Sequence, residues 1–252
     1  MKHKTVGIIG GMGAIATVDL FQKIVSLTDA KKDQDHIHVL IDNNTKIPDR
    51  TAFLLSNNKN DSPKDYLIES AGRLESYGAK ILSIACNTSH YFFPDVQSAV
   101  NIPVINMIEE TALDAADKKL KCVGVLGTEG FIRFVDYKSF YSQYGIETIC
   151  PTDEEQKYVS DLIYNGIKSQ NYAIDTSNFL AVLKRMSDAG VEAFALSCTE
   201  LPIAFSHFQI NYPFIDSSIA LAKKIIVEAG GKIKPVNNTR DLPLSSNYIK
   251  CD

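Results

Sequence analysis

The 252-residue sequence lacks several features that mark common classes of protein. It has no run of the about 18 apolar residues that a membrane-spanning helix needs, so we expect no membrane protein. Its net charge of −4 provides no basic surface for nucleic acid or for an anionic membrane. It contains no CxxC pair, and its five cysteines are widely spaced. This pattern disfavours a disulfide framework or a structural zinc site, and it favours a reducing, cytoplasmic location.

The composition is that of a globular protein, with 45% hydrophobic and 22% charged residues. The length suits two small domains or one large one. Short apolar runs alternate with helical patterns, which is typical of βαβ units and a parallel sheet. In the first half we expect strands at 5–9, 36–41, 79–85 and 102–105, and helices at 14–27 and 63–77.

The second half of the sequence repeats the plan of the first. Three segment pairs align in the same order at offsets of 117, 112 and 110 residues: 4–13 with 121–130, 81–88 with 193–200, and 102–106 with 212–216. Such a repeat predicts an α/β fold with two similar parallel-sheet domains, related by a pseudo-two-fold duplication. We expect residues 1–105 to form the first domain and residues 106–216 the second. The C-terminal helix, within 217–252, should pack back on the first.

The repeat also bears on the N-terminus, where residues 2–18 resemble a secretory signal. A basic start precedes an apolar stretch, and Ala14-Ile-Ala16 resembles a cleavage site. Because the matching segment 121–130 lies in mid-chain, we interpret both copies as a strand followed by a turn.

Each half places a cysteine, Cys86 or Cys198, directly after an apolar strand. Sites in open α/β sheets lie beyond the carboxyl ends of the strands, so the two sulfurs should face a shared cleft. A helix N-terminus lowers a thiol pKa below its free value of about 8.5, and we therefore expect reactive thiolates. Two opposed thiols could remove a proton from one face of a carbon and deliver one to the other. A lone cysteine here would favour a packing role, whereas two in matching positions favour chemistry.

Four segments together resemble the aspartate/glutamate racemase family, nearest to its aspartate racemase branch: Gly10-Gly-Met-Gly13, Asn43-Asn44 with Ile47-Pro-Asp-Arg-Thr51, Ala85-Cys-Asn-Thr88, and Ser197-Cys-Thr-Glu-Leu-Pro202. The resemblance covers nearly the whole chain. It implies two α/β domains with the active site between them, catalysis without cofactor or metal, a small dicarboxylic amino acid as substrate, and a homodimer. The first-strand motif lacks the Asp-Ser pair of glutamate racemases, which disfavours a dedicated cell-wall glutamate racemase.

The resemblance also implies roles for individual residues. It matches Cys86 and Cys198 to the catalytic acid and base. It assigns substrate binding to Arg50, Asn87, Thr88, Lys168 and Thr199, and to Met12 and Glu200 within the same motifs. A guanidinium binds a carboxylate through two hydrogen bonds and an ammonium supplies a point charge, which suits a dicarboxylic substrate and an enolate-like transition state.

Two other functions stay open on the sequence alone. A related cofactor-free thiol enzyme, such as a hydantoin racemase or a malonate-type decarboxylase, is one alternative, and the pair of Arg50 and Lys168 argues against a neutral substrate. A non-catalytic amino-acid or dinucleotide-binding protein is the other alternative, because residues 11–16 fit G-x-G-x-x-A. The acidic residue expected about 20 residues further on is absent there, and Asp42 is the nearest candidate.

The remaining reactive side chains give weaker signals. His90, four residues after Cys86, could activate that thiol or face the cleft rim, and the sequence does not decide between these roles. His36 and His38 lack the convergent partners of a metal site. Cys122 and Cys150 are interpreted as packing residues and Cys251 as idle. The contacts of Thr128 and Glu129 stay open.

Overall fold

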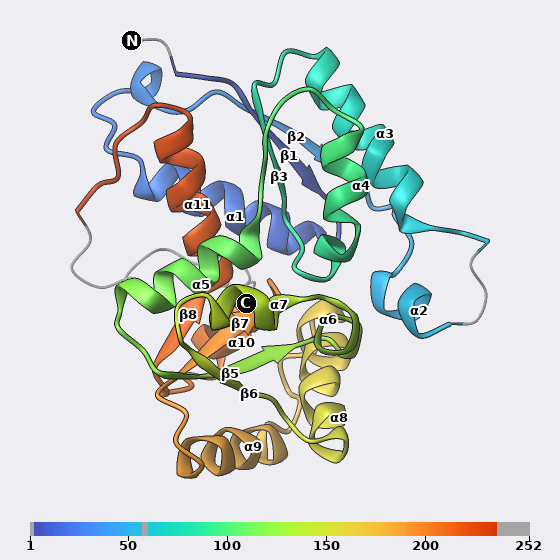
Figure 1. Cartoon of the computed structure of the whole chain (residues 1–252), viewed down its shortest axis with the longest axis vertical. Helices are drawn as coiled ribbons and strands as arrows, with labels where there is room; N and C mark the ends of the chain where they lie inside the picture. Colours follow the sequence, from blue (N-terminus) through green and yellow to red (C-terminus); the bar gives the residue numbers. More distant parts are fainter. Residues whose placement is uncertain (1–2, 57–59, 236–252) are drawn as a thin grey trace.

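The computed structural model describes residues 3–56 and 60–235, and Cys251 with the rest of 236–252 lies outside them. It contains two four-stranded parallel sheets, one above the other in Figure 1. The predicted α/β fold with two similar domains is therefore confirmed. None of the helices within the described ranges is long and apolar enough to cross a membrane.

The first sheet has the strand order β2-β1-β3-β4, with all strands parallel. Its strands are β1 (Val6–Gly10), β2 (Val39–Asn43), β3 (Ile81–Ile84) and β4 (Val104–Ile105). The helical segments between them are α1 (Ala14–Leu27), η1 (Asp33–Asp35), α2 (Arg50–Leu55), α3 (Pro63–Ser76), η2 (Thr88–Phe92) and α4 (Phe93–Ser98).

The second sheet has the equivalent order, β6-β5-β7-β8, which is the structural counterpart of the sequence repeat. Its strands are β5 (Cys122–Gly127), β6 (Glu147–Ile149), β7 (Ala193–Ser197) and β8 (Phe214–Asp216). The helical segments of this part are α6 (Glu129–Phe134), α7 (Tyr137–Ser142), α8 (Asp153–Asp161), the π-helix η3 (Leu162–Lys168), α9 (Ser177–Asp188) and α10 (Leu201–His207).

Local sequence explains where these elements begin and end. Every residue of β1 is buried, as expected for a central parallel strand covered on both faces. The helix predicted at 14–27 is α1, and α3 begins with a Ser62 cap followed by Pro63. The strand predicted at 36–41 is wrong at its start, because pairing with β1 begins only at the register Val6–Val39.

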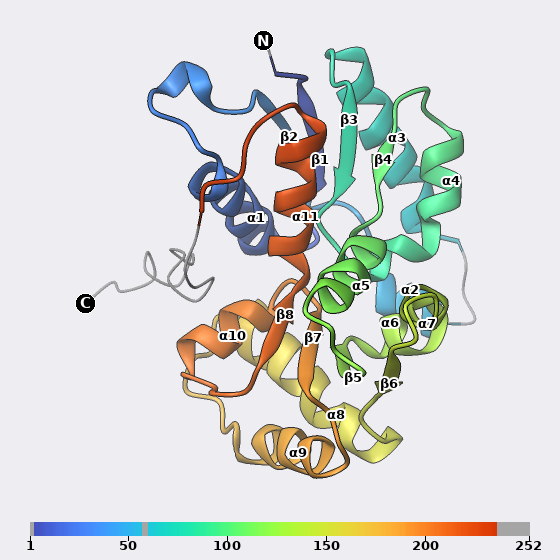
Figure 2. The same ribbon diagram turned by 60° about the vertical axis from the view of Figure 1, so that its left-hand side comes forward.

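The helix after each sheet packs on the core of the other domain, as Figure 2 shows. Apolar residues of α5 (Met107–Asp117), including Ile108 and Ala112, join the core of the second sheet. Those of α11 (Ser217–Glu228), including Ile219 and Ile225, join the core of the first sheet and lie against α1. This exchange places an apolar face of each helix against the core of the opposite domain. We propose a domain boundary at Ile105, since α5 follows it directly.

Candidate active site

Loops that follow four strands converge on one pocket between the sheets. Met12 follows β1, Cys86 follows β3, Thr128 follows β5 and Cys198 follows β7. The carboxyl ends of both sheets therefore point into the same space. All nine site residues predicted from the sequence line it, and the full set is Met12, Asp49, Arg50, Thr51, Cys86, Asn87, Thr88, Thr128, Tyr164, Lys168, Cys198, Thr199 and Glu200.

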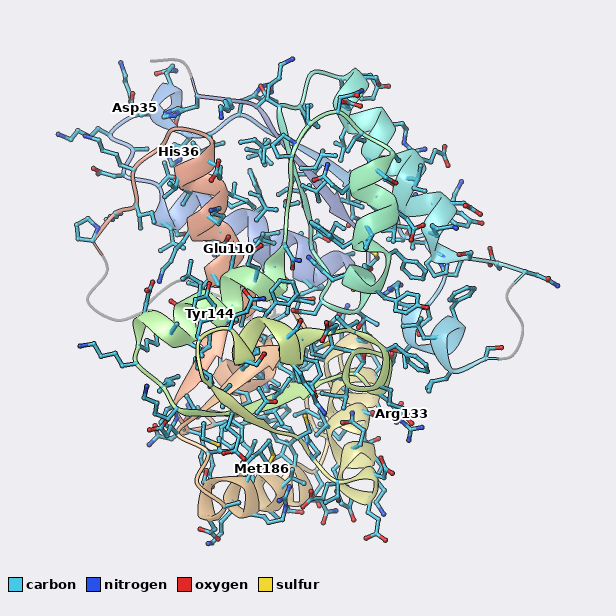
Figure 3. All side chains as sticks on the ribbon, viewed as in Figure 1. Asp35, His36, Glu110, Arg133, Tyr144 and Met186 are labelled. Atoms are coloured by element: carbon cyan, nitrogen blue, oxygen red, sulfur yellow. The ribbon has the colours of Figure 1, made fainter. Side chains whose placement is uncertain are left out.

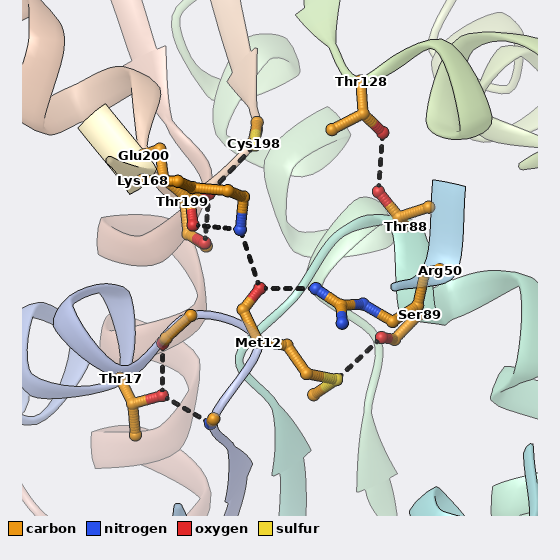
Figure 4. A network of polar contacts seen from close by, with 12 residues as sticks. Met12, Thr17, Arg50, Thr88, Ser89, Thr128, Lys168, Cys198, Thr199 and Glu200 are labelled. Carbon is orange, nitrogen blue, oxygen red and sulfur yellow. Dashed lines mark hydrogen bonds and ion pairs between the residues drawn. The ribbon is translucent and has the colours of Figure 1, made fainter. Parts of the chain in front are cut away.

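The glycine-rich turn after β1 presents the Met12 carbonyl to this pocket (Figure 4). Gly11 has a φ of +88°, and a Cβ there would lie 2.4 Å from the backbone of Asn44, so only glycine fits. The Thr17 hydroxyl accepts a hydrogen bond from the Gly11 N–H and donates one to the Gly13 carbonyl, both at 2.9 Å. The turn is thus packed against the end of β2. Asp42, the acidic residue considered for a dinucleotide site, is paired with Arg73 instead.

Two cations meet at the Met12 carbonyl oxygen. Arg50 donates to it from Nη2 at 2.8 Å, and Lys168 donates from Nζ at 3.4 Å. Arg50 is the first residue of α2, is buried, and has an Nε–H without an acceptor among the described residues. Burial acts to lower the pKa of Arg50, but Cys86 and Asp49 outweigh it and raise that pKa. The guanidinium therefore retains a donor for a bound carboxylate and is placed to stabilise negative charge at Cys86.

On the opposite side, Glu200 joins Lys168 to Cys198. Its Oε1 accepts from Lys168 Nζ at 2.7 Å, and its Oε2 accepts from Cys198 Sγ at 3.0 Å and from the Thr199 hydroxyl at 3.3 Å. Burial acts to raise the pKa of Glu200, but Lys168 outweighs it and lowers that pKa. Glu200 is therefore a carboxylate, and the Cys198 thiol donates to it.

The lowered thiol pKa predicted from the sequence is wrong for Cys198. Burial raises its pKa well above the ordinary value, and the charge of Glu200 raises it further, against the opposing effect of Lys168. The following helix α10 begins only at Leu201, so the nearest full charge is the carboxylate. Cys198 is thus a protonated thiol in the ligand-free protein.

His90 does not activate Cys86. Its Nε2 lies 3.0 Å from the Met107 N–H, which can only donate, and its Nδ1 lies 2.9 Å from the Cys86 carbonyl, which can only accept. The ring is therefore neutral with its proton on Nδ1, and burial lowers its pKa to about 4. His90 holds the backbone of Cys86 in place.

The sequence did not identify two of the residues that close the pocket. The Thr128 hydroxyl lies 2.9 Å from that of Thr88, and this contact joins the two domains. Tyr164 lies within hydrogen-bonding reach of the Thr51 hydroxyl, also across the cleft, and burial raises its pKa to about 12. The spacing of Tyr164 four residues before Lys168 could have indicated a shared helix face. Glu129 pairs with Arg133 and does not line the pocket.

Within the described residues, no group of three or more His, Cys, Asp or Glu side chains is placed to hold a metal ion. Figure 3 shows His36 beside Asp35, at the end of the first domain that lies away from the second. Cys122 and Cys150 are free thiols outside the pocket, and Cys150 contacts the Tyr137 hydroxyl at 2.9 Å.

Comparisons with known proteins agree with this architecture. The family model for Asp/Glu/hydantoin racemases matches residues 9–225, so the chain belongs to that family. The structure of Picrophilus torridus aspartate racemase superposes with a TM-score of 0.82 at 34% identity, covering 92% of this chain and 96% of that one. An aspartate racemase homologue from Pyrococcus horikoshii gives a TM-score of 0.71 at 26% identity, covering 91% of this chain and all of the other.

A sequence relative gives a further view of this family. The broad-specificity amino-acid racemase RacX of Bacillus subtilis is 30% identical over 226 residues, which is 88% of this chain and 96% of that protein. The chain is accordingly an amino-acid racemase of the Asp/Glu type.

Proposed function

We propose that the protein interconverts L- and D-aspartate by a two-base mechanism in which Cys86 and Cys198 are the acid and base, without pyridoxal phosphate or metal. The observation that carries this proposal is that both sulfurs line one pocket, each beside a different charged partner. Arg50 neighbours Cys86, and Glu200 accepts a hydrogen bond from the Cys198 thiol. The likeness to the Picrophilus aspartate racemase supports aspartate as the substrate.

In the proposed reaction one proton leaves the substrate and another enters it. The Cys86 thiolate takes the Cα proton, so that an S–H bond forms and the C–H electron pair delocalises into the α-carboxylate. Cys198 then donates its thiol proton to the opposite face of Cα and becomes a thiolate. The reverse reaction uses the same steps in the opposite order, which is why both thiols are required.

The cations supply substrate selectivity and transition-state stabilisation. The free Nε–H of Arg50 can bind a carboxylate. Lys168 can also bind one when its ammonium no longer donates to the Met12 carbonyl. Positive charge there favours a dicarboxylic substrate and stabilises the second negative charge that develops on the α-carboxylate. Asn87, Thr88 and Thr199 would orient the substrate by hydrogen bonds.

Isotope incorporation tests the proposal. L-Aspartate is incubated with the enzyme in D₂O, and chirality and Cα deuteration are followed together by chiral chromatography and mass spectrometry. We expect each newly formed D-aspartate to carry one solvent deuterium. Newly formed D-aspartate that retains its Cα protium would refute deprotonation by exchangeable thiols.

Cysteine variants test which thiols react. Cys86→Ala and Cys198→Ala should each abolish racemisation, because one face of Cα then has no proton carrier. Cys122→Ala is the matched control, since Cys122 begins β5 and does not line the pocket. Near-normal turnover by either pocket variant would overturn the two-thiol scheme.

A substrate panel and a mass measurement test the remaining details. Aspartate, glutamate, hydantoins and neutral amino acids should be compared by kcat/KM, because one methylene is worth only about 1–3 kcal/mol of discrimination. Similar values for neutral amino acids would replace aspartate specificity with the broad specificity named for RacX. We also propose a cytoplasmic homodimer, which light scattering of the purified protein checks for oligomeric state.

A further inference from the structure

Ser217 connects the two cysteine-bearing segments although it does not line the pocket. Its hydroxyl accepts a hydrogen bond from Asn87 Nδ2 at 3.0 Å and donates one to the Leu196 carbonyl at 2.8 Å. Asn87 is the residue directly after Cys86, and Leu196 lies in β7, two residues before Cys198. The Ser217 side chain thus contacts both the residue next to Cys86 and the backbone of the strand that leads to Cys198.

Ser217 lies among buried polar contacts. Its side chain is fully buried at the first position of α11. The preceding residue, Asp216, caps this helix by accepting from two backbone N–H groups, and Asp216 pairs with Leu196 in the β7–β8 ladder. Lys23, also fully buried, donates to Asp216 at 2.7 Å and to Asp19. Through Asp216 and Lys23, the segment that contains Ser217 is therefore connected to α1 of the first domain.

We infer that Ser217 is a positioning residue that sets the separation of the Cys86 and Cys198 thiols on the two faces of the bound Cα. This inference rests on the proposed two-thiol mechanism. Ser217 acts through Asn87 and the β7 backbone and touches no reacting atom. Its hydroxyl is satisfied on both sides, since it accepts one hydrogen bond and donates one, so its removal would release both segments together.

A positioning role makes a specific kinetic prediction for Ser217→Ala. Inversion needs both thiols in line with Cα, whereas exchange of the Cα proton with retention needs only one. The variant should lose about tenfold to a hundredfold in kcat with little change in KM, since a misplacement of about 1 Å can cost this much. In D₂O, the ratio of deuterium in recovered L-aspartate to deuterium in new D-aspartate should rise by about tenfold.

The neighbouring residue gives a matched control. Ser218 is equally buried, but its hydroxyl has no hydrogen-bond partner among the described residues. Ser218→Ala should therefore keep the wild-type kcat and the wild-type ratio of exchange to inversion. An unchanged ratio in Ser217→Ala, whether or not kcat falls, would overturn the positioning role.

A second pair of variants serves if Ser217→Ala folds poorly. Ser217→Thr and Ser217→Val have the same shape, and only threonine keeps the hydroxyl. We expect the threonine variant to have the lower ratio of exchange to inversion by about tenfold, and equal ratios would overturn the inference. Failure of the mechanism itself is distinguishable, because Cys86→Ala or Cys198→Ala would then remain active whatever the Ser217 variants do.

Discussion

Replacing Glu200 with glutamine should make Cys198 more reactive toward alkylating agents. The substitution keeps the shape of the side chain and removes the carboxylate charge that lies 3.0 Å from the Cys198 sulfur. At an effective dielectric constant of about 20, two like charges at that separation repel by about 5 kcal/mol. Lys168, 2.7 Å from the same carboxylate, offsets part of this repulsion in the wild-type protein.

If the substitution reduces the repulsion of a Cys198 thiolate by a net of only about 1.4 kcal/mol, the Cys198 pKa falls by one unit. Below the pKa the thiolate fraction rises tenfold per unit, so iodoacetamide should alkylate Cys198 about tenfold faster in Glu200→Gln at a fixed neutral pH. Peptide mass spectrometry assigns the modified cysteine, and a series of pH values locates the pKa.

Glu129→Gln is the control for loss of a carboxylate. Glu129 begins α6, pairs with Arg133 at 2.9 Å and does not line the pocket. This variant should leave the alkylation rate of Cys198 unchanged. If Glu200→Gln also left it unchanged across the pH series, the carboxylate would not be what keeps this thiol protonated.

Two further predictions concern stability. Because burial lowers the pKa of His90 to about 4, the unfolded chain binds a proton there first as pH falls. The free energy of unfolding therefore has its full contribution from neutral His90 above pH 6.5 and loses it as the pH falls toward 4. The loss should reach about 2–3 kcal/mol near pH 4.5. In urea unfolding, His90→Asn should lack this pH dependence. Lys23→Met should cost about 3–5 kcal/mol, because it leaves Asp19 and Asp216 as facing buried carboxylates. Lys224→Met removes two partly exposed ion pairs, with Glu110 and Glu228, and should cost under about 1 kcal/mol for each. Equal urea midpoints for the two lysine variants would contradict this reasoning.

The sequence predicted the fold well because the repeat reports on topology directly. Aligned copies of a strand, a turn and a cysteine segment require two sheets of the same strand order, and both sheets have it. The helix predicted at 14–27 was accurate because Gly13 precedes it and because Leu20, Ile24 and Leu27 recur at helical spacing on its buried side. The strand predicted at 36–41 was displaced because apolar alternation does not show which residues find a partner in β1.

The membership of the pocket was also predictable, but its electrostatics were not. Motifs identified Glu200 and Cys198 as neighbours in sequence, yet only the fold shows that the carboxylate accepts a hydrogen bond from the thiol. No local sequence pattern indicated the role proposed for Ser217 either. Asp216-Ser217 has the pattern of an ordinary helix start, and the contact with Asn87 joins residues 130 positions apart.

The duplication that makes the two thiols equivalent in topology does not make them equivalent in charge. In the aligned copies Cys86 matches Cys198, and two residues further on Thr88 matches Glu200. Thr88 contacts the Thr128 hydroxyl, whereas Glu200 contacts its own cysteine. A two-base racemase needs a single proton shared between its thiols, since two thiols offer no base and two thiolates offer no acid. A cation beside Cys86 and a carboxylate beside Cys198 give the two thiols different electrostatic surroundings, and burial together with Glu200 raises the pKa of Cys198 and keeps its proton in place. The divergence of this one position therefore makes Cys198 the proton donor for the first half of the proposed reaction.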